Sequence, residues 1–236
     1  MAEFQSKRER IADKIRKLLA QAASVEGTPE ADTFRMRAFE LVAEYGIEEQ
    51  EYAAEHQTEV KREASSRFFV IDKGKYRPMR LLLLVNIANA LHGATVQHPH
   101  PFKDVLVLEV FAVEHHLDRI AFLFEILADQ MVQGMLDARP PYETTHSGEL
   151  RVYRRSWSSG FAREIRKRIV EAEERILSNS TALALFRDDD QLALEAQDAK
   201  YGDNLKPTKT RRQMSASGFT AGRIAGRSAQ MDPALG

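Results

Sequence analysis

The chain has 236 residues, 43% of them hydrophobic and 29% charged, which is ordinary for a soluble globular protein. It contains no cysteine, which excludes disulfides, thiolate metal sites and cysteine nucleophiles. The formal net charge of −1 conceals an uneven distribution, because residues 151–177 carry eight basic and four acidic side chains. The segment from residue 206 onward carries six basic residues and one acid. This local excess of positive charge is the reason to consider an anionic partner.

The first predicted elements are two helices that form an antiparallel hairpin, which we place at residues 5–56. Apolar residues at helical spacing form one stripe over 11–22 and a second over 34–45. Thr28, between the stripes, is a natural N-cap, and Gly46 is typical of the residue that follows a helix. We treat the hairpin as a separate N-terminal unit.

The second predicted domain covers residues 64–236 and begins with strands and helices in alternation. Strands are expected at 66–72, 94–98 and 105–112, a helix at 77–91 and a long helix from Val113 to Pro140. This order is typical of a small mixed or antiparallel sheet with helices on one face. The predicted fold class is therefore α+β and mostly helical.

Helices are also expected in the C-terminal part of the chain. The segment 151–177 has an apolar side that includes Trp157 and Phe161. Three consecutive acids, Asp188 to Asp190, precede an apolar-periodic stretch, so we interpret Asp190 as the N-cap of the next helix.

The last predicted helix has a face made of glycine. Ser215 or Ser217 is its expected N-cap, and Gly218, Gly222 and Gly226 recur every four residues. Each glycine costs about 1 kcal/mol relative to alanine inside a helix, and either close packing against another backbone or a phosphate bound on the smooth face could offset this cost. We expect this face to contact another helix, either within the chain or across a homo-oligomer.

Several segments of the sequence carry a family pattern. The first is "DKIRKLLAQAAS" followed by "EADTFRMRAFELVAEYGI", the second is "SWSSGFAREIRKRI" and the third is the closing "GFTAGRIAGRSA". Together they resemble a bacterial and bacteriophage family that is catalogued as a domain of unknown function. The resemblance implies a shared fold and a phage or bacterial setting. It implies no activity and no catalytic residue.

The histidines are the first candidates for chemistry. His92, His98 and His100 lie around one predicted turn, and His115 and His116 open the long helix. Imidazoles that converge could bind a metal, but the spacing matches no recognised metal motif. The sequence therefore favours exposed histidines, and we assign no metal, no cofactor and no catalytic residue.

The basic segments are the stronger candidates. Arginine at high density suits phosphate oxygens, which its guanidinium binds bidentately. Acidic residues within 151–177 could instead pair with these arginines and leave a self-neutralised helix face. The residues expected to contact phosphates are Arg154, Arg155, Arg166, Lys167, Lys209, Arg211 and Arg212.

The main functional hypothesis is a non-catalytic protein of phage or mobile-element type that binds DNA or RNA. One alternative is a protein-interaction module that uses the acidic hairpin and helix seams, and another is a metal-dependent hydrolase that uses the histidines. The longest apolar run, at 81–85, is far shorter than the ~20 residues of a membrane span, and the N-terminus lacks the apolar core of a signal peptide. We therefore expect no membrane contact and a cytoplasmic location.

Overall fold

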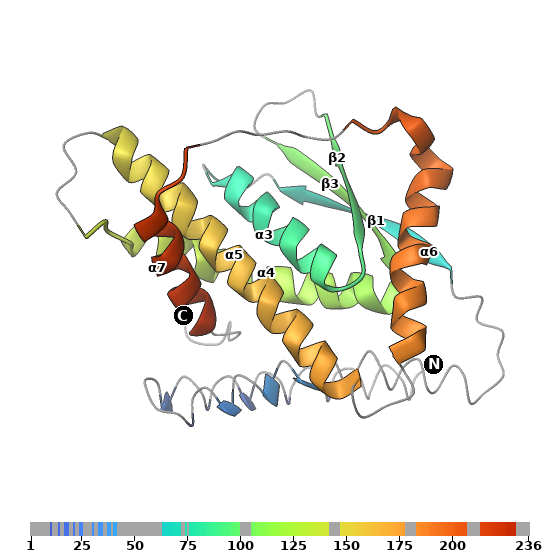
Figure 1. Ribbon diagram of the computed structural model, residues 1–236, viewed down its shortest axis with the longest axis horizontal. Helices are drawn as coiled ribbons and strands as arrows, with labels where there is room; N and C mark the ends of the chain where they lie inside the picture. The colour runs from blue at the N-terminus through green and yellow to red at the C-terminus, as the bar shows by residue number, and fades with distance from the viewer. Residues whose placement is uncertain are drawn as a thin grey trace.

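The computed structural model describes residues 63–71, 74, 76–99, 105–141, 147–177, 183–206 and 213–229, together with part of residues 10–41. The elements of the main body appear in Figure 1. They are β1 (Ala64–Ile71), α3 (Arg77–Ala90), β2 (Ala94–His98), β3 (Leu106–Val113), α4 (Glu114–Asp137), α5 (Ser147–Leu177), α6 (Leu183–Tyr201), a 3₁₀ turn (Gly202–Asn204) and α7 (Ala216–Arg227).

The sheet has three antiparallel strands in the order β1-β3-β2, so β3 is the central strand. Glu109 on β3 pairs with Phe68 on β1 and with Val96 on β2. The sequence predicted all three strands and the helix between the first two. The mostly helical α+β class is confirmed.

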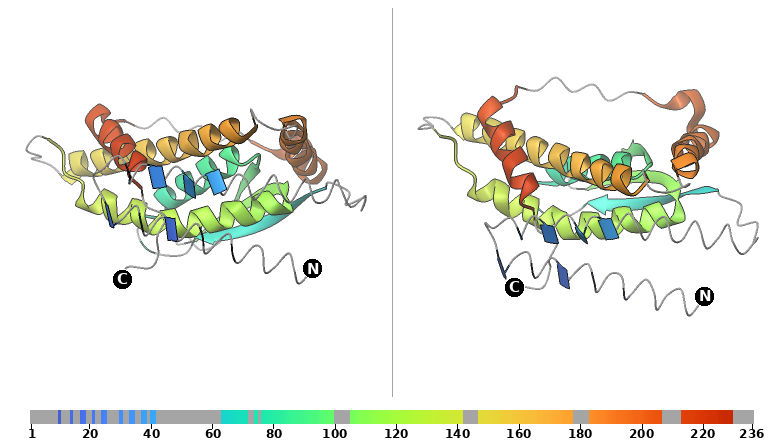
Figure 2. Two further views of the ribbon diagram at one scale, coloured as in Figure 1. Left: turned by 90° about the horizontal axis from the view of Figure 1, so that it is seen from below. Right: turned by 60° about the horizontal axis from the view of Figure 1, so that its bottom comes forward.

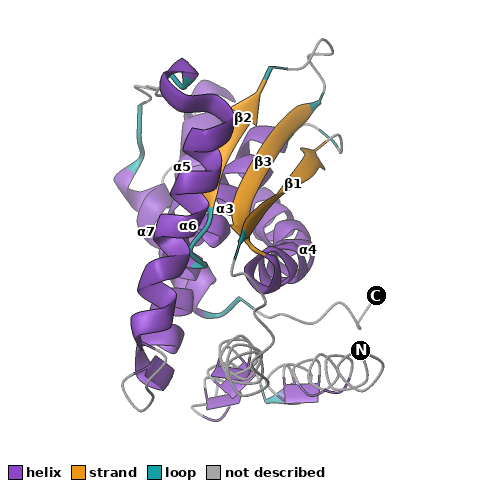
Figure 3. Ribbon diagram, turned by 90° about the vertical axis from the view of Figure 1, so that its right-hand side faces the viewer, coloured by secondary structure: helices purple, strands orange, loops and turns teal. Residues whose placement is uncertain are grey.

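Both faces of the sheet carry helices. Leu108 and Val110 of β3 belong to the main hydrophobic core, which α3, α4 and α5 complete. Phe111 points to the other face, where it packs in a smaller cluster with Ala193 of α6. Figure 3 shows the strands between α4 and α6. The sequence predicted helices on one face only, and α6 adds a layer on the other because alternate residues of β3 are apolar on both sides.

Helix α3 ends in a left-handed turn. His92, not Gly93, occupies the left-handed position after the helix, with φ of 57°. The N–H of Gly93 donates to the carbonyl of Ala88 at 2.8 Å, which is the hydrogen bond of a Schellman motif. A Cβ on Gly93 would lie 3.0 Å from that carbonyl oxygen. Glycine is therefore needed for space, while a histidine takes the strained backbone position.

Helix α7 lies against the first half of α5, as both views in Figure 2 show. Ser215 caps α7 and accepts a hydrogen bond from the N–H of Gly218. The three glycines of α7 are buried against the backbone of α5. The expected close packing is confirmed within the chain. Because α5 fills the glycine face, this face is not available for the homo-oligomer that we considered.

Helix α6 begins earlier than expected. It starts at Leu183, so Asp188, Asp189 and Asp190 lie inside the helix and Asp190 is not its N-cap. The prediction was wrong because we read the three acids as a helix start. The fold instead turns Asp189 inward, and this side chain is fully buried.

Part of the N-terminal hairpin is described. Its described residues between 10 and 41 are helical apart from Val25, which lies in a turn. Ala38 is fully buried in the main core, and Leu18 and Leu41 pack against that core. Thr28 and Gly46 lie outside the described residues, and the division into two domains stays a prediction. None of the described helices is long and apolar enough to cross a membrane.

Candidate functional site

Two of the predicted phosphate-binding residues donate hydrogen bonds to backbone carbonyls. Arg154 is half-buried, and its Nη2 donates to the carbonyl of Leu136 at the end of α4, at 2.6 Å. The Nη2 of Arg155 donates to the carbonyl of Gln213, also at 2.6 Å. A carbonyl partner is neutral, so both guanidinium groups keep their full positive charge.

The next two predicted residues lie in solvent. Arg166 and Lys167 are exposed on α5, and the Nζ of Lys167 is 3.3 Å from a carboxylate oxygen of Glu171, whose side chain is 46% exposed. Exposed pairs of this kind contribute little and are screened by salt. Lys209, Arg211 and Arg212 lie outside the described residues.

We call the outward side of α5 that carries Arg155, Arg163, Arg166 and Lys167 the α5 basic surface. Arg155 and Arg166 are eleven residues apart, close to three full turns, so they lie on the same side of the helix. Arg163 and Lys167 are exposed and four residues apart, and they flank Arg166. Among the residues that the structure describes, no carboxylate is within ion-pair distance of Arg155, Arg163 or Arg166.

Two of the five acids of α5 point away from this surface. Glu164 is 3% exposed and accepts hydrogen bonds from Arg223 at 2.8 Å and from Arg227 at 3.0 Å, both on α7. Burial alone would raise the pKa of Glu164, but the two arginines outweigh it and lower the pKa. Glu173 is also buried and faces α3 and α4. Neither carboxylate can neutralise the outward arginines.

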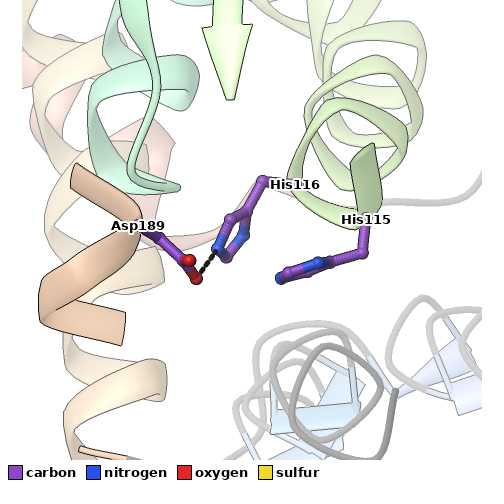
Figure 4. Close-up of side chains that lie close together, drawn as sticks. All are labelled: His115, His116 and Asp189. Carbon is purple, nitrogen blue, oxygen red and sulfur yellow. Dashed lines mark hydrogen bonds and ion pairs between the residues drawn. The ribbon is translucent and has the colours of Figure 1, made fainter. Parts of the chain in front are cut away.

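A second group of functional side chains lies inside the protein. His115 and His116 come from the first turn of α4, and Asp189 comes from α6 (Figure 4). Their ligand atoms all lie within 4.8 Å of one another, and all three residues are buried. His116 Nε2 is 3.1 Å from Asp189 Oδ2, and the two histidine rings are 4.0 Å apart between centroids. We call these three residues the His-His-Asp cluster.

A chain of charged groups extends from the cluster. Arg119 Nη1 is 3.2 Å from His116 Nδ1, and Arg119 Nη2 donates to Glu173 at 2.6 Å. Glu173 in turn lies 3.2 Å from His92 Nε2, and the other ring nitrogen of His92 lies 3.1 Å from Asp190. The chain therefore joins α4, α5, α6 and the turn after α3.

The charged groups of this chain shift one another's pKa values. Burial would lower the pKa of His92, but Asp190 and Glu173 outweigh this effect and raise it to about 9. Burial would raise the pKa of Glu173, but Arg119 and the nearby histidines lower it to about 2. His92 is therefore protonated and Glu173 ionised at neutral pH.

The expectation of exposed histidines was wrong for the four that the structure describes, because His92 and His98 are half-buried and His115 and His116 are buried. His115 is 6% exposed and His116 is fully buried. Local spacing could not reveal the cluster, because Asp189 is 73 residues from His116 in the chain. The one signal in the sequence was the pair of histidines at the start of an otherwise apolar helix face. His100 lies outside the described residues.

A third group of polar side chains surrounds the buried carboxylate of Glu109 and has a structural role. Glu109 is fully buried on β3 and is bonded by His98 at 2.9 Å, by Lys200 at 2.6 Å and by the hydroxyl of Tyr201. Burial would raise the pKa of Glu109, but hydrogen bonds from Lys200, Ser66, Tyr201 and His98 lower it to about 2. These bonds satisfy the carboxylate and fasten the end of α6 to the sheet.

Comparison with known proteins gives one match. Residues 10–49 match the family model "Protein of unknown function (DUF2786)". No curated protein and no solved structure matches the chain. The DUF2786 segment overlaps the predicted hairpin and supports its resemblance to a family of unknown function. The α5 basic surface and the His-His-Asp cluster both lie outside this segment, so the match assigns a function to neither.

Proposed function

We propose that the protein binds nucleic acid, DNA or RNA, without catalysing a reaction on it. The contacts are made to phosphates by Arg154, Arg155, Arg166, Lys167, Lys209, Arg211 and Arg212. A phage or mobile-element setting in a bacterial cytoplasm belongs to this proposal and rests on the sequence resemblance.

The observation that carries the proposal is the inward direction of Glu164 and Glu173. The sequence allows these acids to neutralise the arginines of their own helix. In the structure Glu164 is paired with α7 and Glu173 with Arg119 and His92. Arg163 and Arg166 therefore face solvent without Glu164 and Glu173 as partners, which favours a polyanionic partner.

A second observation supports a contribution from the segment 206–212. Arg155 donates to the carbonyl of Gln213, and Gln213 follows Arg212 directly in the chain. This hydrogen bond holds Gln213 beside α5. Arg154 and Arg155 retain their charge because their partners are carbonyl groups.

Fluorescence anisotropy with labelled single-stranded and duplex oligonucleotides tests the proposal over a range of salt concentrations. The double variant Arg166→Gln, Lys167→Gln and the triple variant Lys209→Gln, Arg211→Gln, Arg212→Gln should both bind more weakly. The slope of log K against log salt should fall by about 0.7–0.9 for each phosphate that a variant no longer neutralises.

Arg10→Gln, Lys14→Gln is the matched control, because it removes two exposed positive charges from the N-terminal helical segment. Affinity that does not depend on salt would contradict the proposal. Equal losses of affinity in the control and in the α5 double variant would also contradict it, since the effect would then come from net charge alone.

One observation favours the alternative of a protein-interaction module. Phe68 and Val70, on the edge strand β1, are 52% and 60% exposed. An edge strand with exposed apolar side chains can accept a strand from another protein. A partner that is retained after nuclease treatment, and that no longer binds the Phe68→Ser, Val70→Thr variant, would support this alternative over the first.

A further inference from the structure

The His-His-Asp cluster brings three metal-ligating side chains together where water has little access. His115 is 6% exposed, and His116 and Asp189 are fully buried. Figure 4 shows the two rings at the start of α4 turned toward the carboxylate of α6. The nitrogens and the carboxylate oxygen that could serve as ligands lie within 4.8 Å of one another. The three groups are therefore close enough to share one ion after small side-chain rotations.

The chemistry of the three donors selects a class of metal ion. Two imidazoles and one carboxylate suit first-row transition metals, and zinc takes such ligands in tetrahedral sites. Zinc binds nitrogen at about 2.0–2.1 Å and carboxylate oxygen at about 2.0–2.2 Å, which places tetrahedral neighbours roughly 3.4 Å apart. The observed separation of His116 Nε2 and Asp189 Oδ2 is 3.1 Å. The spacing of this pair is close to that of two zinc ligands, and both side chains would turn so that their lone pairs converge on the ion.

The charges around the cluster favour a cation. Three carboxylates, those of Glu173, Asp189 and Asp190, lie in or next to it. Among the described residues, the basic side chains of the same network are Arg119 and His92. Carboxylates therefore outnumber basic side chains around the cluster, and a divalent cation adds positive charge where carboxylates prevail.

Arg119 opposes an ion at His116. It donates to Nδ1 of His116 at 3.2 Å, whereas an imidazole that binds metal through Nε2 carries its proton on Nδ1. Arg119 would therefore give up this longer bond when metal binds. It retains the 2.6 Å ion pair with Glu173, so its charge stays compensated.

We infer that His115, His116 and Asp189 form a binding site for one divalent transition-metal ion, with zinc as the best fit to the ligands. The site links the first turn of α4 to α6. Three protein ligands leave one position of a tetrahedral ion for a water molecule or a further ligand. Its function is to fasten α6 to the body of the protein, independently of the proposed nucleic-acid binding.

The test is a titration of the full chain, stripped with a chelator, with Zn²⁺ by calorimetry and with Co²⁺ by visible absorption. One ion per chain is expected, and the cobalt complex should show the intense d–d bands of a tetrahedral site. Zinc should also raise the melting temperature of the chain.

The variants Asp189→Asn and His115→Ala distinguish a specific metal site from nonspecific metal binding. Asparagine keeps the shape of aspartate and can still accept a hydrogen bond from His116, so this variant should fold. Both variants should lose at least 100-fold in zinc affinity and should melt at the same temperature with and without zinc. His98→Ala is the matched control, because this histidine contacts Glu109 in a separate cluster. The control should bind zinc like the parent chain.

Two results would overturn the inference. One is the absence of stoichiometric zinc binding by the parent chain at micromolar concentration, which would make the cluster a hydrogen-bonded network only. The other is binding with unchanged affinity in both Asp189→Asn and His115→Ala, which would locate the ion elsewhere on the chain. Neither result depends on whether the protein binds nucleic acid.

Discussion

Replacing Gly222 by alanine tests the contact between α5 and α7 directly. A Cβ at this position would lie 2.6 Å from the carbonyl carbon of Trp157 and closer still to its oxygen. The obstacle is helix backbone, so it cannot rotate away as a side chain could. An ordinary contact needs about 3.4 Å or more, so α7 would have to move outward by roughly 1.5 Å.

The expected cost follows from two opposing effects. Alanine inside a helix is favoured over glycine by about 1 kcal/mol. Overpacking costs about 1–3 kcal/mol, and a gap of 0.5–1 Å along the rest of the interface forfeits a quarter to a half of its dispersion energy. We expect a net loss of about 2–3 kcal/mol. For a chain of this size this corresponds to a fall in melting temperature of roughly 5–10 °C.

Urea and thermal denaturation measure the loss of stability, and hydrogen exchange locates it. Faster exchange of the α7 amides is expected, with little change in β3. Gly148→Ala is the matched control, because an added Cβ at this helical position meets no atom within 4 Å. The control should be neutral or slightly stabilising. If Gly222→Ala were as stable as the control, the close approach of the two helices would be refuted.

Three further predictions concern single side chains. Glu109→Gln should lower the free energy of unfolding at neutral pH and make it depend less on pH in the acid range. The lowered pKa of Glu109 means that the carboxylate stabilises the fold above about pH 4.5 and that this stabilisation is lost as the pH falls toward 2. Urea titrations at several pH values measure the effect. Ser215→Ala should cost about 1 kcal/mol because it removes the N-cap of α7, whereas Ser217→Ala should cost less; equal losses in chemical denaturation would contradict the cap. Glu164→Gln should cost about 2 kcal/mol, since it weakens two charge-assisted hydrogen bonds, and hydrogen exchange should speed up in α7 before it does in α4.

Local patterns in the sequence predicted most of the fold. The glycine face of α7 and the apolar alternation of β3 both reflect contacts that repeat along one element, so spacing alone revealed them. The register Phe68–Glu109 and the docking of α6 on the second face depend on contacts between distant segments. The apolar second face of β3 indicates that something covers it, but it does not indicate which segment, so the position of α6 could not be predicted.

The candidate sites also differ in how much of each can be predicted from local patterns and how much depends on contacts between distant segments. Sequence reasoning identified the basic helix, because charge density is a local property. It could not determine that Glu164 turns toward α7 while Arg163 and Arg166 turn outward, because both directions are compatible with one helix. It also missed the His-His-Asp cluster, since Asp189 approaches His116 only after α6 has packed.

The order of α5 and α7 along the chain has a consequence for synthesis. Helix α5 ends at Leu177 and α7 begins at Ala216, so the ribosome completes the first helix well before its partner exists. Until α7 emerges, the side of α5 that receives the glycines has no partner helix. A chain that terminates before Gln213 would expose the ring of Tyr153 and a row of backbone carbonyls to solvent. Prematurely terminated copies should therefore be recognised by chaperones and proteases as unfinished, whereas a chain that includes α7 conceals this signal.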